Sequence, residues 1–470
     1  MRLRLLSSLI VSIWLGTAYL SAFPYHFEFS NNQAMGFIGD ESTYGAKWCQ
    51  YVENYFYTRY PEKRMIFYNA GCKNDTAFDV LERLEQDVLE RKLDYCMIML
   101  GTWDGGFEDY NSARFEAYQE NMRLLLDRLK RARCYPLLMS PPMFDFQTRQ
   151  RRMEDESYRF RLKSMAPNYN GVMGLYGSWL RDEAYERDSR FIDTWGPLNT
   201  YTADVRKTNV EFSLMPDAVH PDPGGSVVIA GEVIRTLAME RDKIGSIKVH
   251  YVGGDSGWSS SGTSGGSISQ LSGSNRHMSF IWKPRALPWA MPGEASIGVE
   301  LADIDARFNQ ELLHVVGLAA GDYQIFIAGT KIGDKFTHAE LAHGVEIHKF
   351  QERPQFKRAQ SVANMNARRY ETSIIPLRDL WQDVKRVRVN FPGDQARLAA
   401  IMAEVTPQMN ALRLKSRELT DKIYEASKPL GRNFEVRKIY TSSELKEIEK
   451  AKKAEEEAKK KAEAEKENPE

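Results

Sequence analysis

The side chains with the clearest potential for chemistry lie in a few short segments of the chain. They combine carboxylates, a histidine, a hydroxyl, an amide and an indole: Asp40, Glu41, Ser42, Asn74, Trp103, Asp217 and His220. An aromatic face beside polar groups is typical of a sugar-binding site. Glu41 and Asp217 could also form the carboxylate pair of glycosidic-bond hydrolysis, which requires a separation of about 5–9 Å. Both chemistries require these segments to converge in space.

Alternating strands and helices would produce that convergence. Apolar runs bounded by turn residues predict strands at residues 35–40, 64–71, 94–101, 135–142 and 190–194. Apolar residues at helical spacing predict helices at residues 44–60, 76–92, 115–133 and 224–241. This alternation predicts an α/β fold with a doubly wound, flavodoxin-like parallel sheet. Loops at the carboxyl ends of such strands carry function, and the residues above fall in those places.

The length of 470 residues exceeds a usual single domain and therefore predicts two folded units. The first is expected at residues 33–240. The segment at residues 251–279 is dense in Gly and Ser, which predicts a flexible linker. A smaller α+β unit is expected at residues 280–440. The tail at residues 443–470 is mostly Ala, Lys and Glu, which predicts a solvated charged helix or disorder.

Inside the second unit, residues 311–333 alternate apolar and polar side chains around a Gly-Asp pair, which predicts a β-hairpin. Helices are expected at residues 339–345, 359–369 and 377–388.

The first residues are typical of a signal peptide. Arg2 and Arg4 supply a basic start, residues 5–20 form an apolar run, and Ala18 and Ala22 offer cleavage points. The run is short for a span of about 20 residues, which favours cleavage near residue 22 over a retained anchor. No later stretch could cross a bilayer. We expect a periplasmic or extracellular protein.

Export permits disulfides among the four cysteines, Cys49, Cys72, Cys96 and Cys134. Their spacing is not that of a zinc site. Cys96 and Cys134 should begin neighbouring strands, which makes them the preferred pair, with buried free thiols as the alternative.

Charge and motifs narrow the range of partners. Lys and Arg number 64 and Asp and Glu number 64, so no basic excess indicates nucleic acid. No Gly-rich phosphate loop follows a strand, which argues against a nucleotide cofactor. The remaining histidines lack a metal-ligand spacing. The run from Arg149 to Arg152 predicts a solvated basic loop rather than a contact with an anionic glycan. The expected partner is a small molecule or a glycan, and the oligomeric state stays open.

Three separated blocks resemble the SGNH/GDSL-type hydrolases. They read FIGDESTYG, then YNAGCKNDTAFDVLERLEQDVLERKLDYCMIMLGTWDGG, then PDAVHPDPGGSVVIA, in the family's order and spacing. The resemblance covers most of residues 33–240. The Gly-Ser segment, the Pro288-Trp289 pair and the second unit also look like extended esterase-like proteins of bacterial envelopes. The resemblance implies acyl transfer from oxygen esters by a serine nucleophile, a histidine base and an orienting aspartate.

Several signature positions depart from the family. Asp217 and His220 match its D-x-x-H motif, and Asp40 and Gly101 match flanking positions. Family members read Gly-Asp-Ser-x-Thr-x-Gly, so Glu41 stands where the serine belongs and Ser42 is one residue late. Two oxyanion donors are also replaced, as a glycine becomes Asn74 and an asparagine becomes Trp103.

These changes should nearly extinguish serine-esterase chemistry. Loss of one oxyanion donor costs about 10²–10³ in rate, and loss of a serine nucleophile costs of the order of 10⁶ in a related chemistry. The leading interpretation is an impaired esterase that binds a carbohydrate or acylated glycan. The simplest form of this interpretation is an envelope scaffold that binds no small molecule. The alternatives are an active ester hydrolase with Ser42 as a shifted nucleophile and His220 and Asp217 as base and orienter, or the carboxylate-pair chemistry above.

Overall fold

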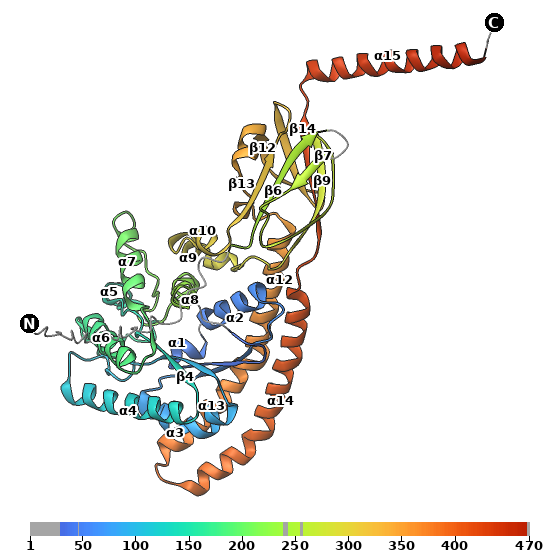
Figure 1. Cartoon of the computed structure of the whole chain (residues 1–470). Helices are drawn as coiled ribbons and strands as arrows, with labels where there is room; N and C mark the ends of the chain where they lie inside the picture. Colours follow the sequence, from blue (N-terminus) through green and yellow to red (C-terminus); the bar gives the residue numbers. More distant parts are fainter. Residues whose placement is uncertain (1–28, 46, 238–242, 254–256, 468–470) are drawn as a thin grey trace, which may run out of the picture.

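The computed structural model describes residues 29–45, 47–237, 243–253 and 257–467 (Figure 1). The predicted signal segment at residues 1–22 lies outside these residues. In the described part of the chain, no helix combines the length and the apolar character that crossing a membrane would require.

Five parallel strands form the first sheet, in the order β2-β1-β3-β4-β5. This is the flavodoxin-like strand order, so the predicted doubly wound α/β fold is confirmed. The strands are β1 (Ala34–Gly39), β2 (Ile66–Gly71), β3 (Tyr95–Met99), β4 (Tyr135–Met139) and β5 (Arg190–Ile192). β1 is buried at every position and pairs with β2 and β3, so its carboxyl end opens at the centre of the sheet.

Helices cover both faces of this sheet, because its strands are apolar on both sides. One buried cluster joins α2 and α8 to the sheet, and the other joins α3, α4 and α6. The helices of this domain are α1 (Glu41–Tyr44), α2 (Lys47–Arg59), α3 (Ala77–Asp87), η1 (Leu89–Arg91), α4 (Ser112–Arg131), α5 (Phe146–Arg152), α6 (Tyr169–Glu186), α7 (Trp195–Arg206) and α8 (Pro223–Thr236).

Local capping positions the two helices nearest the predicted site. Thr76 and Asp79 form a reciprocal capping box at the start of α3, with each side chain accepting from the other residue's main-chain N–H. Asp222 caps α8 by accepting from Gly225 N at 2.6 Å, and Pro223 occupies the first turn. α8 therefore begins three residues after His220.

The described residues of the segment predicted as a linker at residues 251–279 instead lie mostly in sheet structure, so that prediction is wrong. It contributes to β6 (Gly245–Gly253), β7 (Gly257–Ser260), β8 (Gly266–Ser274) and β9 (His277–Pro284). Apolar residues recur among the small ones: Trp258 and Met278 are buried, and Ile268 and Leu271 pack against the same core. Gly and Ser here fill the exposed face of strands, which their composition alone could not distinguish from a linker.

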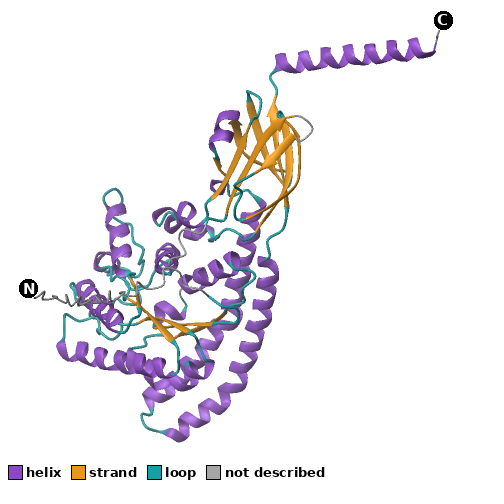
Figure 2. Ribbon diagram, in the orientation of Figure 1, coloured by secondary structure: helices purple, strands orange, loops and turns teal. Residues whose placement is uncertain are grey.

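The second unit packs two sheets around one apolar cluster (Figure 2). Their strand orders are β13-β10-β6-β7 and β12-β11-β14-β9-β8. The added strands are β10 (Glu311–Val316), β11 (Asp322–Ile327), β12 (Thr330–Thr337), β13 (Val345–Glu346) and β14 (Arg432–Ile439). Two short helices complete it, α11 (His338–His343) and η4 (Ile347–Lys349). The short helices η3 (Gly293–Ala295), α9 (Ser296–Leu301) and α10 (Ile304–Phe308) instead belong to the core of the first domain, where η3 and α9 contact α8.

The predicted hairpin at residues 311–333 is also wrong in its pairing. β10 pairs in parallel with β6 in one sheet, whereas β11 pairs with β12 in the other. The hairpin lies between β11 and β12, where Ala328 and Gly329 have φ values of 47° and 78°. Two consecutive positive φ angles are the geometry of the tight turn that joins antiparallel strands.

The helices predicted for residues 359–388 do not belong to a separate second unit. α12 (Pro354–Arg369), the π-helical turn η5 (Tyr370–Ile374), α13 (Ile375–Asn390) and α14 (Gln395–Ser427) run along the first domain (Figure 1). Buried ion pairs join the two parts: Arg369 binds Glu53 at 2.6 Å, and Arg378 binds Asp87 at 2.6 Å. The chain then re-enters the sandwich as β14. The final helix α15 (Ser442–Glu467) projects away from both parts.

Candidate active site

The nucleophile position of the motif lies at the turn from β1 into α1. Asp40 is the N-cap of α1, and its Oδ1 accepts from Ser42 N at 2.8 Å. The turn packs tightly on Gly71 at the end of β2. A side chain at this position would place its Cβ only 2.3 Å from Tyr44 N, so the close approach requires glycine. Ser42 is only 2% exposed, and its carbonyl accepts from Trp48 Nε1 at 3.0 Å. Ser42 is therefore a buried residue of the turn.

Glu41, rather than Ser42, contacts the histidine. Glu41 Oε2 lies 3.5 Å from His220 Nε2. The opposite ring nitrogen, Nδ1, lies 2.8 Å from Asp217 Oδ2, so the predicted Asp217–His220 contact is present. Both Glu41 oxygens also accept from Arg159, at 2.9 and 3.0 Å. The arrangement is a chain of alternating charges from Asp217 through His220 and Glu41 to Arg159.

The electrostatics of this chain favour a protonated imidazole. Burial lowers the pKa of His220, but the hydrogen bond and charge of Asp217 and the charge of Glu41 outweigh it and raise the pKa above 6.5. Burial likewise opposes ionisation of Asp217, yet contact with His220 holds its pKa below 3.8. A histidine that already carries its proton cannot accept one from a nucleophile. The charge of Glu41 therefore adds to the effect of Asp217 in favouring the protonated form of His220.

Asn74, which the family resemblance predicts at the second oxyanion position, has a left-handed backbone, at φ 59°. Asparagine tolerates this conformation better than most residues, which explains why it can replace a glycine here. Its side chain is exposed. Its carbonyl accepts from Lys385 Nζ at 3.0 Å, so a distant helix holds this loop.

Gly101 and Trp103 follow β3. Gly101 has φ +128°, and a Cβ there would lie 2.9 Å from Pro141 Cγ, so only glycine fits. Trp103 packs edge-on against Phe107 with ring centroids 5.0 Å apart. Its Nε1 is buried and has no hydrogen-bond partner among the described residues. An indole N–H left in this state costs about 1–3 kcal/mol, which a bound acceptor would recover.

The loop after α5 contributes residues that the sequence motifs did not reveal. Phe160 stacks on His220 with centroids 5.9 Å apart, and Lys163 Nζ lies 4.8 Å from the centre of the Trp103 ring. Together with Arg159, they cover the site from one side. The only signal in the sequence is the alternation of basic and apolar residues from Arg159 to Lys163.

The Arg149–Arg152 run is not the solvated loop that was predicted. It forms the end of α5, and its arginines donate to main-chain carbonyls of neighbouring loops. Arg149 reaches Lys163 O at 2.8 Å, and Arg152 reaches Pro216 O at 3.0 Å. These bonds hold the segments on either side of His220, which is a structural use of the positive charge.

Helix α13 closes the site from the other side. Gln382 Oε1 accepts from Lys73 N at 3.1 Å, and Lys385 Nζ binds Asp75 Oδ1 at 2.8 Å. Asp379 accepts from Tyr44 OH at 2.5 Å. The three side chains recur every three residues along one helix face, yet they act on loops some 300 residues earlier in the chain. No motif at either position predicts such contacts.

The cysteines are free thiols, and all four are buried. Cys96 and Cys134 are neighbours, as the strand prediction required, with their sulfur atoms 2.8 Å apart. Burial and the contact with Cys134 raise the pKa of the Cys96 thiol. Among the described residues, no three His, Cys, Asp or Glu side chains gather closely enough to hold a metal ion.

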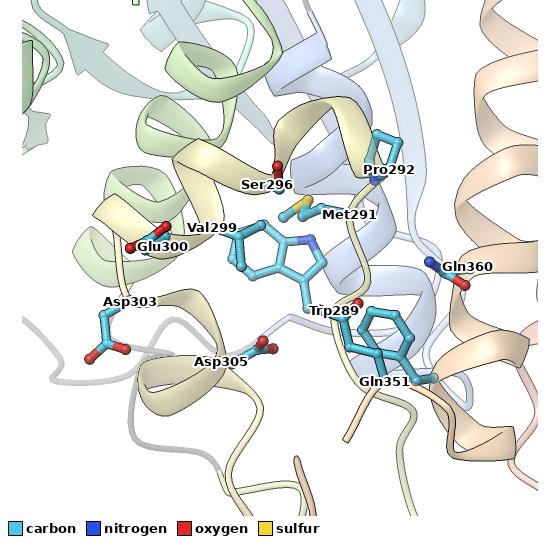
Figure 3. A pocket seen from close by; sticks show the side chains of 12 residues that line it. Trp289, Met291, Pro292, Ser296, Val299, Glu300, Asp303, Asp305, Gln351 and Gln360 are labelled. Carbon is cyan, nitrogen blue, oxygen red and sulfur yellow. The ribbon is translucent and has the colours of Figure 1, made fainter. Parts of the chain in front are cut away.

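A separate pocket of about 370 Å³ lies beside Trp289 (Figure 3). Its lining comes from residues 289–305 and 351–360 and includes the carboxylates Glu300, Asp303 and Asp305. Trp289 is 1% exposed, and its Nε1 donates to Tyr51 O at 2.8 Å, so it anchors the connecting segment to α2. This pocket is distinct from the Glu41–His220 site, none of whose residues lines it.

Stability is expected to fall as the pH rises from 5 to 8. Asp40 is 1% exposed, and burial raises its pKa to about 7 despite the hydrogen bond from Ser42. A carboxyl whose pKa is raised by folding stabilises the folded protein fully when the pH is below the pKa of that carboxyl in the unfolded chain. This contribution is lost as the pH rises through the folded-state pKa of about 7. The raised pKa of His220 acts in the same direction. Its contribution to stability is complete below pH 6.5 and is lost as the pH rises through the pKa of His220 in the folded protein.

Asp40→Asn tests this expectation, because an amide oxygen can still cap α1. The variant should lose roughly 3 kcal/mol of the pH dependence between pH 5 and 8, measured by urea unfolding. Asp383→Asn, on the exposed face of α13, is the matched control and should keep the wild-type slope. An unchanged slope in Asp40→Asn would show that Asp40 ionises normally in the folded protein.

This chain is similar to known proteins over part or most of its length. Residues 37–227 match the GDSL-like lipase/acylhydrolase family. An acetylxylan esterase from Geobacillus stearothermophilus is 26% identical over 208 residues, which are 43% of this chain and 85% of that protein. A crystal structure of an acetylxylan esterase from the same organism covers 46% of this chain and 98% of its own, with 23% identity and a TM-score of 0.37. The structure of a gut microbial diltiazem-metabolizing enzyme covers 88% of this chain and 99% of its own, with 19% identity and a TM-score of 0.73, so its likeness in fold extends through the C-terminal region.

Proposed function

Since residues 37–227 belong to the GDSL-like lipase/acylhydrolase family, we propose that the protein is an impaired ester hydrolase that binds an acylated glycan around Glu41 and His220. The position of Glu41 carries the proposal. Its carboxylate replaces the nucleophile, holds Arg159 through two hydrogen bonds and lies 3.5 Å from His220 Nε2. A serine hydroxyl at that place would give its proton to His220, whereas the carboxylate has no such proton to give and adds to the effect of Asp217 in raising the pKa of His220.

A carbohydrate suits the groups that surround this ion pair. The half-buried Trp103 offers an aromatic surface, and Arg159 and Lys163 offer donors for hydroxyl and acyl oxygens. The buried, unpartnered Nε1 of Trp103 adds a donor that a sugar oxygen would satisfy. The similarity to an acetylxylan esterase supports an acetylated xylan as the first ligand to test.

Export to the periplasm or outside is part of the proposal. It is supported by the basic start at Arg2 and Arg4 and the apolar run at residues 5–20. An acylated polysaccharide would be met in that compartment.

The intact Asp217–His220 contact, at 2.8 Å, favours one alternative, which is an active ester hydrolase with Ser42 as the nucleophile. Against it stands the burial of Ser42, which is 2% exposed. The carboxylate-pair chemistry is less favoured, because Glu41 and Asp217 both contact His220 and the imidazole occupies the space between them.

Binding is expected to depend on Trp103. Isothermal titration of the mature protein with acetylated xylo-oligosaccharides should show binding that Trp103→Ala weakens by about 10- to 150-fold, since a buried aromatic contact contributes about 1.5–3 kcal/mol. Trp179→Ala is the matched control, because Trp179 packs against Arg123 in another part of the domain. A glycan array of acetylated and plain cell-wall oligosaccharides extends the search. No binding on that array would refute the carbohydrate proposal.

A further inference from the structure

Two adjoining cavities lie between the edge of the first sheet and α14. The first, of about 410 Å³, is lined by β2 and by residues of η1, α12, η5, α13 and α14. The second, of about 510 Å³, lies between η1 and the middle of α14. Glu90, Arg91 and Arg413 line both cavities, so they meet at these side chains. Both volumes fall in the range of about 300–1,000 Å³ that small-molecule sites occupy.

The first cavity has an apolar floor at the free edge of β2. Phe67, Leu93, Ile374 and Leu377 line it and are otherwise almost fully buried. Ile66 also lines it, although this large aliphatic side chain is 50% exposed. Apolar surface that is left open in a concave site favours the apolar part of a ligand.

The cations around this floor outnumber the anions that neutralise them. Five arginines line the first cavity: Arg64, Arg91, Arg369, Arg413 and Arg417. Three of them have carboxylate partners, in the pairs Arg64–Asp421, Arg91–Glu90 and Arg369–Glu53. In the described part of the chain, Arg413 and Arg417 have no ion-pair partner. The joined cavities therefore carry an uncompensated positive charge.

Unpartnered donors mark where an anionic group would sit. Arg413 donates through Nη1 to Asn410 Oδ1 at 2.9 Å, yet its buried Nε has no acceptor. The buried Nε of Arg91 and the buried Nε1 of Trp381 also have no acceptor among the described residues. Trp381 is 1% exposed and lines the second cavity. Two donors without acceptors at the junction of the cavities, and a third in the second cavity, favour an acceptor-rich ligand.

We propose that these joined cavities bind an amphiphile with one oxyanion head group and an apolar chain. The head group would lie between Arg91 and Arg413, where guanidinium groups can grip a carboxylate or phosphate through paired hydrogen bonds. The chain would lie on the floor beside Ile66. This site is independent of Glu41 and His220, and a fatty acid and an alkyl phosphate share the chemistry that it recognises.

Calorimetric titration of the full chain with decanoate and decyl phosphate, below their micelle concentrations, tests the site. At least one of them should bind, while decyltrimethylammonium should not. Preference for decanoate identifies a carboxylate lipid, and preference for decyl phosphate identifies a phosphate head group. Acetate and inorganic phosphate should bind much more weakly, because they leave the apolar floor uncovered.

Three variants make the test specific. Arg413→Gln should weaken binding about tenfold, since it removes a charge-assisted hydrogen bond. Arg397→Gln, an exposed arginine on the same helix, should leave the affinity unchanged. Ile66→Glu places a negative charge at an exposed position of the floor and should abolish binding without unfolding the protein. The proposal is overturned if neither anionic amphiphile binds, if the cationic one binds equally well, or if Arg413→Gln behaves like Arg397→Gln.

Discussion

Glu41→Ser is expected to create hydrolysis of p-nitrophenyl acetate where the wild-type protein has almost none. The new hydroxyl would stand at the start of α1, where Glu41 Oε2 now lies 3.5 Å from His220 Nε2. Without the carboxylate, His220 loses one of the charges that raise its pKa and can accept the hydroxyl proton, while Asp217 keeps the ring oriented. Restoration of a nucleophile should raise kcat/KM by about 10²–10³, because the altered oxyanion donors still limit the rate.

Adding Trp103→Asn to Glu41→Ser should give a further gain of up to about 10²–10³, since an amide donor would replace the indole. Glu41→Ala is the matched control: it removes the same carboxylate without supplying a hydroxyl and should stay inert. Glu41→Ser/His220→Ala should lose the gain. If the wild-type protein already hydrolyses the ester and Ser42→Ala abolishes that activity, Ser42 is the nucleophile and the impaired-enzyme proposal is wrong.

Arg378→Met should destabilise the whole protein by about 3–5 kcal/mol, because it leaves a buried carboxylate without its principal partner. Asp87 is fully buried and accepts from Arg378 at 2.8 and 2.6 Å. Burial opposes ionisation of Asp87, but Arg378 and Arg83 lower its pKa to about 2. Arg378 also donates to Gly71 O at 2.8 Å, so the same guanidinium ties α13 to the end of β2.

The effect is measured as a shift in the urea unfolding of the full chain. Arg386→Met, on the exposed side of α13, is the matched control and should change stability by less than about 1 kcal/mol. Arg378→Met/Asp87→Asn should recover part of the loss, since the double change removes the unpaired charge. Equal stabilities for Arg378→Met and Arg386→Met would mean that α13 is not part of the folded core of the first domain.

The strands of the first sheet were predictable because their signal is local. The run around Ile98 is apolar at nearly every position, which is the pattern of a parallel strand buried on both faces. The prediction of a linker in the Gly-Ser segment was wrong for the opposite reason. Its strands bury only an occasional side chain, such as Trp258 or Met278, and the rest of the pattern matches that of a flexible chain.

The hairpin predicted at residues 311–333 was wrong because the true partner of β10 lies far away in the sequence. β10 and β11 are adjacent in the chain and alternate as hairpin strands do, but β10 finds a parallel partner in β6, some 65 residues earlier. Strand partners depend on which sheet buries each apolar face, and a local pattern does not contain that information.

The sequence by itself determined the α/β class, and it predicted that Glu41 stands at the nucleophile position, because motifs and apolar periodicity are read along the chain. Only the tertiary structure decided that Glu41 pairs with Arg159, that Phe160 covers His220, and that α13 holds the Asn74 loop. These contacts join residues from about 60 to more than 300 positions apart. They form because buried charges and open apolar faces must find partners wherever the folded chain supplies them.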